Sequence, residues 1–247
     1  MTTQNMPGTD AARHGTGDAD LTIMLAAHDA FRRDLTRLAR TASAANLSDP
    51  ARRESVAAGW DLFKRQLHMH HTAEDEIIWP VLRPRLAYSE NALSVLDAME
   101  EEHERIDPLL AAVDAAFQGE AGEMGRPGSG GFEGVVPPGE DRLADVIDVL
   151  ASTVTGHLAH EERDGLPLIG VALTGAEWRG VGFKIARKNG LSNGGEMFAW
   201  ILDGVGRQDA AATLRALPPP LRLLYRAIWK PLRQVPALLA GAGSIAY

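Results

Sequence analysis

Apolar residues recur every three or four positions in four stretches before residue 165, and this spacing predicts four amphipathic helices. The first predicted helix covers about residues 21–42, and its inner face carries Leu21, Leu25, His28, Phe31, Leu35 and Leu38. The second begins after Ser48-Asp49-Pro50, a cap followed by proline. Its inner face carries Leu62, Phe63, Leu67, His70, Glu74 and Ile77. We expect Pro80 and Pro84 to end or kink this helix.

The third predicted helix covers about residues 87–117, with a kink expected at Pro108. Its inner face carries Leu96, Met99, His103, Ile106, Leu110 and Val113. A segment rich in Gly, Pro and Glu follows at residues 118–139 and is predicted to be a mobile loop. The fourth predicted helix carries Val146, Leu150, Val154, His157 and Glu161 on one face. We expect Gly165-Leu166-Pro167 to stop it.

Four such helices in succession indicate an all-α protein built on an up-down-up-down four-helix bundle. We expect the bundle at residues 21–170, after a flexible N-terminal tail at residues 1–20. Residues 171–247 contain short helical patterns broken by Gly and Pro, so we interpret them as a C-terminal helical extension. Its segment 221–239 mixes apolar and basic residues and could lie on an anionic membrane. We favour a cap on the bundle, because two prolines interrupt any long amphipathic helix there.

The composition excludes several kinds of site and partner. The chain has 247 residues and no cysteine, so disulfides, thiolate zinc sites and iron–sulfur clusters are excluded. A formal net charge of −8 argues against non-specific binding to nucleic acid. The N-terminal residues lack the order of a secretory signal, and no stretch is apolar for long enough to span a bilayer. We therefore expect a cytoplasmic protein.

An internal repeat carries the candidate chemistry. The segment His70-His71-Thr72-Ala73-Glu74-Asp75 aligns with His157-Leu158-Ala159-His160-Glu161-Glu162, and both contain His-x-x-x-Glu followed by a second acid. Each unit has a proline ten positions after its first histidine, and each follows a helix with one inward histidine. A lone histidine on an apolar face is more often an ordinary core residue, and a single His-x-x-x-Glu is often an ordinary pair. The matched repeat favours a metal site instead.

The spacing brings these side chains together. Residues four apart on a helix differ by about 40° around its axis, at roughly 3.6 residues per turn, so each His–Glu pair points at one spot. The predicted ligands are His28, His70, Glu74, His103, His157 and Glu161. Burying them without a partner costs of the order of several kcal/mol, a penalty that metal ions remove. Imidazole and carboxylate without sulfur suit iron or manganese, and six ligands exceed the usual need of one zinc ion. We therefore predict two metal ions.

The two units resemble the signature of the hemerythrin-like, or HHE cation-binding, family. The segments HHTAEDEIIWP (70–80) and HLAHEERDGLP (157–167) carry the likeness, with Leu166 where an aromatic residue is common. The resemblance covers roughly residues 21–170. The extension also resembles the tails of many actinobacterial members, through Glu177-Trp178-Arg179 and residues 217–225.

The resemblance implies two non-haem iron ions with an oxo or hydroxo bridge, and Glu74 and Glu161 as bridging carboxylates. Oxygen-carrying hemerythrins have His-x-x-x-His on the third helix, whereas the matching position here is Asp107. Asp107 could be a ligand, but we favour a solvated or capping acid, because Pro108 disturbs the local helix. The oxygen carriers also place the fourth-helix acid one position later, at Glu162, but Glu161 fits the repeat and the helical angle better.

Two spare histidines, His71 and His160, are further candidate ligands, although we expect them beside the ligands or at the surface. A site with one imidazole fewer than an oxygen carrier should keep an open position and favour the ferric state. We therefore predict reaction with, or sensing of, hydrogen peroxide, oxygen or nitric oxide, with a peroxide-decomposing or stress-protective role. The alternative is a non-enzymatic iron or oxygen sensor, or a reversible oxygen binder, that signals through its extension. The ligand motif is the same in both.

Overall fold

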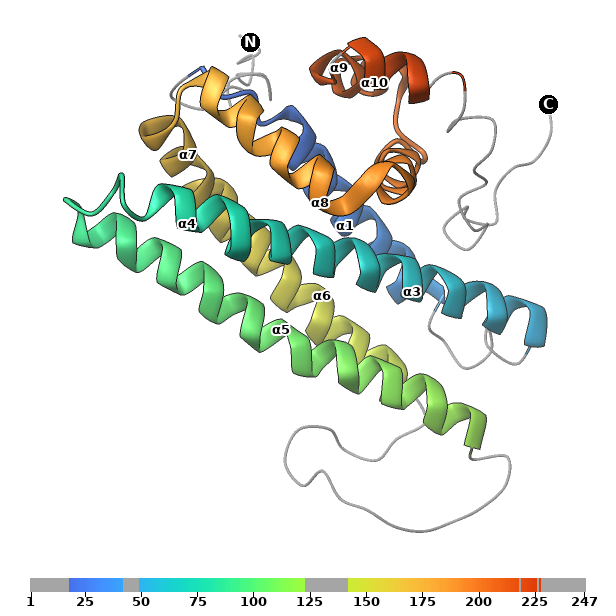
Figure 1. Cartoon of the computed structure of the whole chain (residues 1–247). Coiled ribbons are helices and arrows are strands. Elements are labelled where there is room, and N and C mark those ends of the chain that lie inside the picture. Colours follow the sequence, from blue (N-terminus) through green and yellow to red (C-terminus); the bar gives the residue numbers. More distant parts are fainter. Residues whose placement is uncertain (1–17, 42–48, 123–141, 218, 226, 228–247) are drawn as a thin grey trace, which may run out of the picture.

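The protein is described by a computed structural model that covers residues 18–41, 49–122, 142–217, 219–225 and 227. Its helices are α1 (Thr22–Thr41), α3 (Pro50–Ala73), η1 (Glu74–Ile78), α4 (Trp79–Leu82), α5 (Glu90–Gly122), α6 (Arg142–His160), η2 (Glu161–Gly165), α7 (Leu166–Ala172), α8 (Gly175–Ile201), α9 (Arg207–Ala216) and α10 (Pro219–Leu224). Helices α1, α3, α5 and α6 form a bundle, and α8 packs against α1 and α3 (Figure 1). No described helix is long and apolar enough to cross a membrane.

The four long helices enclose one core. Helix α1 contacts α3 and α6, and α5 contacts the same two neighbours, which gives the predicted up-down-up-down bundle. Two clusters of buried apolar side chains fill its interior. On every helix the candidate ligands fall between these clusters, since Phe31 and Leu67 belong to one and Ile78 and Met99 to the other. The polar site is therefore enclosed between two apolar layers.

The predicted helices agree with the observed ones, and most differences lie at their ends. Asp49 caps α3, where its Oδ1 accepts a hydrogen bond from the N–H of Ala51 at 3.1 Å. Helix α5 passes through Pro108 as one element and includes residues 118–122 of the predicted loop. The rest of that predicted loop, residues 123–139, lies outside the described residues, as do residues 1–17 of the predicted tail.

The expected helix stop at Gly165-Leu166-Pro167 is wrong, because the chain stays helical to Ala172. In each repeat unit a five-residue π-helix begins at the glutamate, and a proline follows. Proline has no N–H, so it cannot bond the carbonyl four residues earlier. The wider turn instead pairs the N–H of Trp79 with Glu74 and that of Leu166 with Glu161. Such π turns occur frequently at functional sites.

The extension packs on the bundle through α8. Trp200 is 1% exposed and donates its indole N–H to Asp34 of α1 at 2.6 Å. Arg33 donates to the carbonyls of Trp200 and Asp203 at 3.1 and 2.7 Å. These contacts make the described part of the extension a cap on α1. Residues 228–239 of the segment considered for membrane contact lie outside the described residues.

Candidate metal centre

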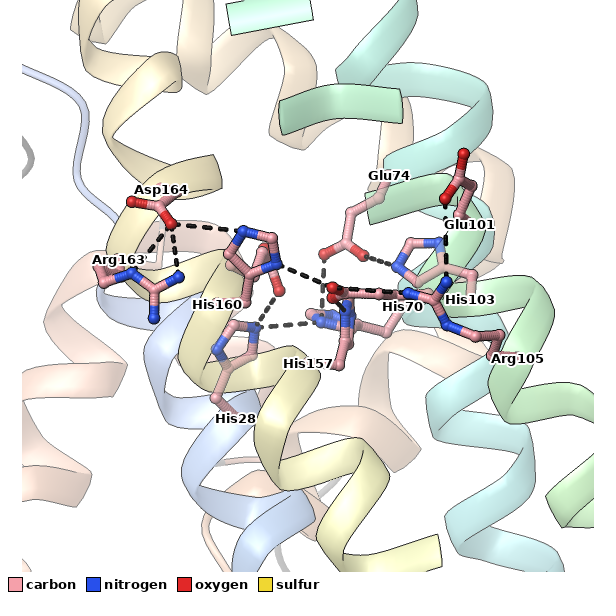
Figure 2. Close-up of polar contacts among 12 residues, drawn as sticks. His28, His70, Glu74, Glu101, His103, Arg105, His157, His160, Arg163 and Asp164 are labelled. Atoms are coloured by element: carbon pink, nitrogen blue, oxygen red, sulfur yellow. Dashed lines mark hydrogen bonds and ion pairs between the residues drawn. The ribbon is translucent and has the colours of Figure 1, made fainter. Parts of the chain in front are cut away.

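The six predicted ligands and His71 lie together in the middle of the bundle, in two neighbouring groups. One group contains His28, His70, Glu74 and Glu161, and the other contains His71, His103 and His157. Within each group the candidate donor atoms are all within 4.8 Å of one another. Every helix of the bundle contributes. Figure 2 shows the side chains that point toward one another from different helices, among them His28, His70, Glu74, His103 and His157.

His71 was expected beside the ligands or at the surface, and the surface position is wrong. Its side chain is buried, and its ring stacks on that of His103 with centroids 3.9 Å apart. The reason lies in the position of α3 between α1 and α5. Neighbouring residues on a helix differ by about 100°, so His70 faces His28 of α1 while His71 faces His103 of α5. The aligned residue of the second unit, Leu158, is apolar, so the repeat alone did not reveal this histidine.

The other three uncertain candidates lie outside the two groups. Asp107 is exposed on α5. Glu162 accepts a hydrogen bond from the Nδ1 of His28, and His160 donates to Glu102. The expected set of four buried imidazoles is therefore too small, because His71 supplies a fifth.

Three of the imidazoles donate a hydrogen bond to a carboxylate on the side of the ring that faces away from the ligand groups. The Nδ1 atoms of His28, His103 and His157 each donate at 2.9 Å, to the acids Glu162, Asp75 and Glu102 respectively. Two of these contacts connect one half of the bundle with the other. Asp75 of the first repeat unit accepts from His103, which precedes the second unit. Glu162 of the second unit accepts from His28, which precedes the first. Such partners fix the tautomer and leave Nε2 facing the ligand groups.

The donor atoms at the centre fit metal ions. Both carboxylate oxygens of Glu74 and Glu161 and the Nε2 atoms of His71, His103 and His157 are buried without a hydrogen-bond partner among the described residues. The Nε2 of His28 lies 3.1 Å from Glu161, and that of His70 lies 3.1 Å from Glu74. Two ligands at right angles around an ion, with bonds of about 2.1 Å, would lie about 3 Å apart. The Nε2 atoms of His28 and His70 also lie 3.2 Å from each other, so the donors have the spacing of ligands around a shared ion.

A comparison with protein families agrees with this site. Residues 19–169 match the family described as hemerythrin HHE cation binding domain. The chain belongs to this HHE family. No curated protein and no solved structure gives a match. The matched region of this HHE protein ends within α7, so α8, α9 and α10 lie beyond it.

The buried carboxylates of the HHE site compete with its histidines for protons. Burial and the neighbouring Glu161 raise the pKa of Glu74 well above its usual value. Burial also raises the pKa of Glu161, but the close approach of His28 outweighs it and lowers that pKa to about 2. Burial lowers the pKa of His28, yet Glu161 and Glu162 overcome it and raise the pKa to about 9. Protons on His28 and Glu74 thus balance charge that a metal ion would otherwise balance, and metal binding should release protons.

Changing Asp107→His should leave the metal content of this HHE protein unchanged. The side chain at this position is exposed and belongs to neither ligand group. Changing His71→Ala should instead lower the bound metal, because it removes a buried donor. Metal analysis and the optical spectrum of both loaded variants test this. A changed spectrum in the Asp107→His protein, with no change in His71→Ala, would reverse the assignment.

Proposed function

We propose that this HHE protein holds two iron ions and reacts with small oxidants, with hydrogen peroxide as the turned-over substrate. One observation carries the proposal: two adjacent groups together place five imidazoles and two carboxylates in one buried layer. His71, His103 and His157 would hold one ion, and His28 and His70 the other. The carboxylates of Glu74 and Glu161 would bind both ions. Imidazole and carboxylate without thiolate suit iron.

The burial of the site supports a small substrate. None of the seven donor side chains is more than 9% exposed, and apolar layers lie on both sides along the bundle. A large organic substrate could not reach the donors without opening the bundle. Hydrogen peroxide, oxygen and nitric oxide need only small fluctuations of the packed side chains.

The carboxylates behind the imidazoles support redox turnover. When bound, two iron ions would relay two electrons between two peroxide molecules, one H2O2 being oxidised to O2 and the other reduced to two waters. This reaction consumes no external reductant. Asp75, Glu102 and Glu162 each accept the Nδ1 proton of a ligand histidine, which makes Nε2 a stronger donor and favours the higher metal charge. That preference argues against stable storage of oxygen on a ferrous site.

His71 supports a second candidate, reversible oxygen binding. It raises the number of buried imidazoles to five, so the expected deficit relative to the oxygen carriers is absent. The two candidates share the same site and differ in what happens after the oxidant binds. Kinetics with oxygen and with peroxide separate them.

We expect the iron-loaded protein to evolve oxygen from hydrogen peroxide, and its reduced form to be oxidised by oxygen without a lasting adduct. Stopped-flow spectra of the reduced protein mixed with oxygen, together with an oxygen electrode during peroxide addition, measure both. The matched control is the Glu74→Ala/Glu161→Ala protein treated identically with iron. An adduct that deoxygenation fully reverses, without peroxide turnover, would instead establish an oxygen binder.

A further inference from the structure

The carboxylates behind the ligand histidines differ in what else they bind. Oε1 of Glu162 accepts from the Nδ1 of His28 at 2.9 Å and also from Arg32 at 2.7 Å. Asp75 directs both oxygens at the Nδ1 of His103, at 2.9 and 3.0 Å. Among the residues that the structure describes, only the carboxylate behind His28 therefore shares its bonding oxygen with a guanidinium at hydrogen-bond distance.

In the part of the chain that the structure describes, the second ligand group has no equivalent of Arg32. Among the described residues no Lys or Arg forms an ion pair with Asp75. Arg105 approaches Glu102 only at 3.8 Å and is 61% exposed, so solvent screens it. Arg32 lies four residues after His28, and the residue four after His103 is Asp107, which is exposed and acidic. The repeat thus has a cation at this position in one unit and an anion in the other.

The presence or absence of a guanidinium on the carboxylate changes how strongly the histidine Nε2 donates electrons to a metal ion. A carboxylate that accepts the Nδ1 proton draws it away from the ring and makes Nε2 a better electron donor. When the same oxygen also binds a guanidinium, its charge is partly neutralised and its effect on the ring falls. His28 is therefore a weaker donor than its acid partner alone would make it. The oxygens that accept from His103 and His157 bind no guanidinium, and although Glu102 also accepts from His160 at 2.8 Å, it does so through its other oxygen.

We propose that Arg32 is a positioning residue that weakens metal binding at His28 and His70, so that the two ions bind in unequal steps. The group of His71, His103 and His157 fills first. This inference rests on the proposed two-ion site. It assigns Arg32 an electrostatic role that acts through Glu162. The alternative is a purely structural role, in which the Arg32–Glu162 ion pair only joins α1 to η2, and this alternative predicts a different result.

The two roles predict different signs for two substitutions. Under the electrostatic role, Arg32→Met frees Glu162 for His28 and tightens the weaker binding step, whereas Glu162→Gln loosens it. Under a structural tie, both substitutions break the same contact and both loosen binding. Each change should shift the weaker dissociation constant about tenfold, the lower end of the effect of such partners on metal affinity. The tighter step should not move in either variant.

The experiment is a titration of the metal-free full chain with Mn²⁺, followed by calorimetry and by metal analysis. Arg32→Lys keeps the cation and should restore the wild-type weaker step. Arg105→Met is the matched control, and it should leave both steps unchanged because Arg105 is exposed and distant from Glu102. Circular dichroism confirms that each variant is folded.

The outcomes separate this inference from the proposed function. Binding of a single ion by the wild-type chain would defeat the two-ion site itself. Two ions that bind with equal affinity would overturn the inference and leave the two-ion site standing. Weaker binding in both Arg32→Met and Glu162→Gln would do the same. Opposite shifts, with rescue by Arg32→Lys, support it.

Discussion

Replacing either Glu74 or Glu161 with alanine should reduce the bound metal from the proposed two ions per chain to less than one. Both side chains are fully buried, and all four of their oxygens lack hydrogen-bond partners among the described residues. Each carboxylate lies against histidines that belong to the ligand groups, so its loss removes donors and leaves the imidazoles without an anion. Metal analysis after loading and desalting measures the result.

Asp75→Ala gives the graded comparison. Its side chain holds His103 from behind and does not belong to either donor group. We expect affinity to fall about 10–100-fold, with two ions still bound at saturating metal. The exposed neighbour Glu76 is the control, since it pairs with Lys188 at the surface and its removal should leave metal binding intact. Equal metal loss in the Glu74, Asp75 and Glu161 variants would show that the wrong acids have been assigned to the centre.

Trp200→Ala should lower the free energy of unfolding by about 3–5 kcal/mol, the usual cost of truncating a buried aromatic residue. The ring is 1% exposed and lies 4.8 Å from Phe31 between centroids. Its removal also leaves the buried Asp34 carboxylate without the hydrogen bond that the indole N–H donates. Urea denaturation of the iron-loaded protein, followed by far-UV circular dichroism, measures the change.

Phe183→Ala is the matched control for this prediction. Phe183 lies on the same helix but is 60% exposed, so its loss should change stability by no more than about 0.5 kcal/mol. A Trp200→Ala protein as stable as the Phe183→Ala protein would mean that the extension unfolds separately from the bundle. Two separate denaturation transitions in the unmodified protein would lead to the same conclusion.

The bundle helices could be predicted because their apolar faces keep the helical period over many turns. The principal ligand candidates could be predicted because they lie on those apolar faces and because the His-x-x-x-Glu pattern occurs twice. The helical stretch after Glu161 could not, because Pro167 is ordinarily a stop signal, and only the wider turn at η2 accommodates it. The second acids of the repeat were visible in the sequence, but their partners were not. Asp75 bonds a histidine 28 positions away on another helix.

The docking of the extension could not be predicted from local patterns. Asp34 is a charged residue on an amphipathic helix, and such a side chain is ordinarily expected to be exposed to solvent. In the structure it is 2% exposed, because Trp200 covers it and Arg33 pairs with it. The hydrogen bond from Trp200 to Asp34 joins residues 166 positions apart. The periodicity of α1 contains no information about a partner from so distant a segment.

The acids Asp75 and Glu162 connect the two halves of the bundle in a reciprocal way. The pair α1–α3 and the pair α5–α6 each form a helical hairpin with its own His-x-x-x-Glu unit. Asp75 of the first hairpin orients His103 of the second, and Glu162 of the second orients His28 of the first. Reciprocal contacts of this kind are what a two-fold symmetric dimer makes, where every contact occurs twice. Within one chain, the two hairpins therefore contact each other as the two halves of such a dimer would. Neither hairpin orients its own leading histidine, and each depends on an acid from the other.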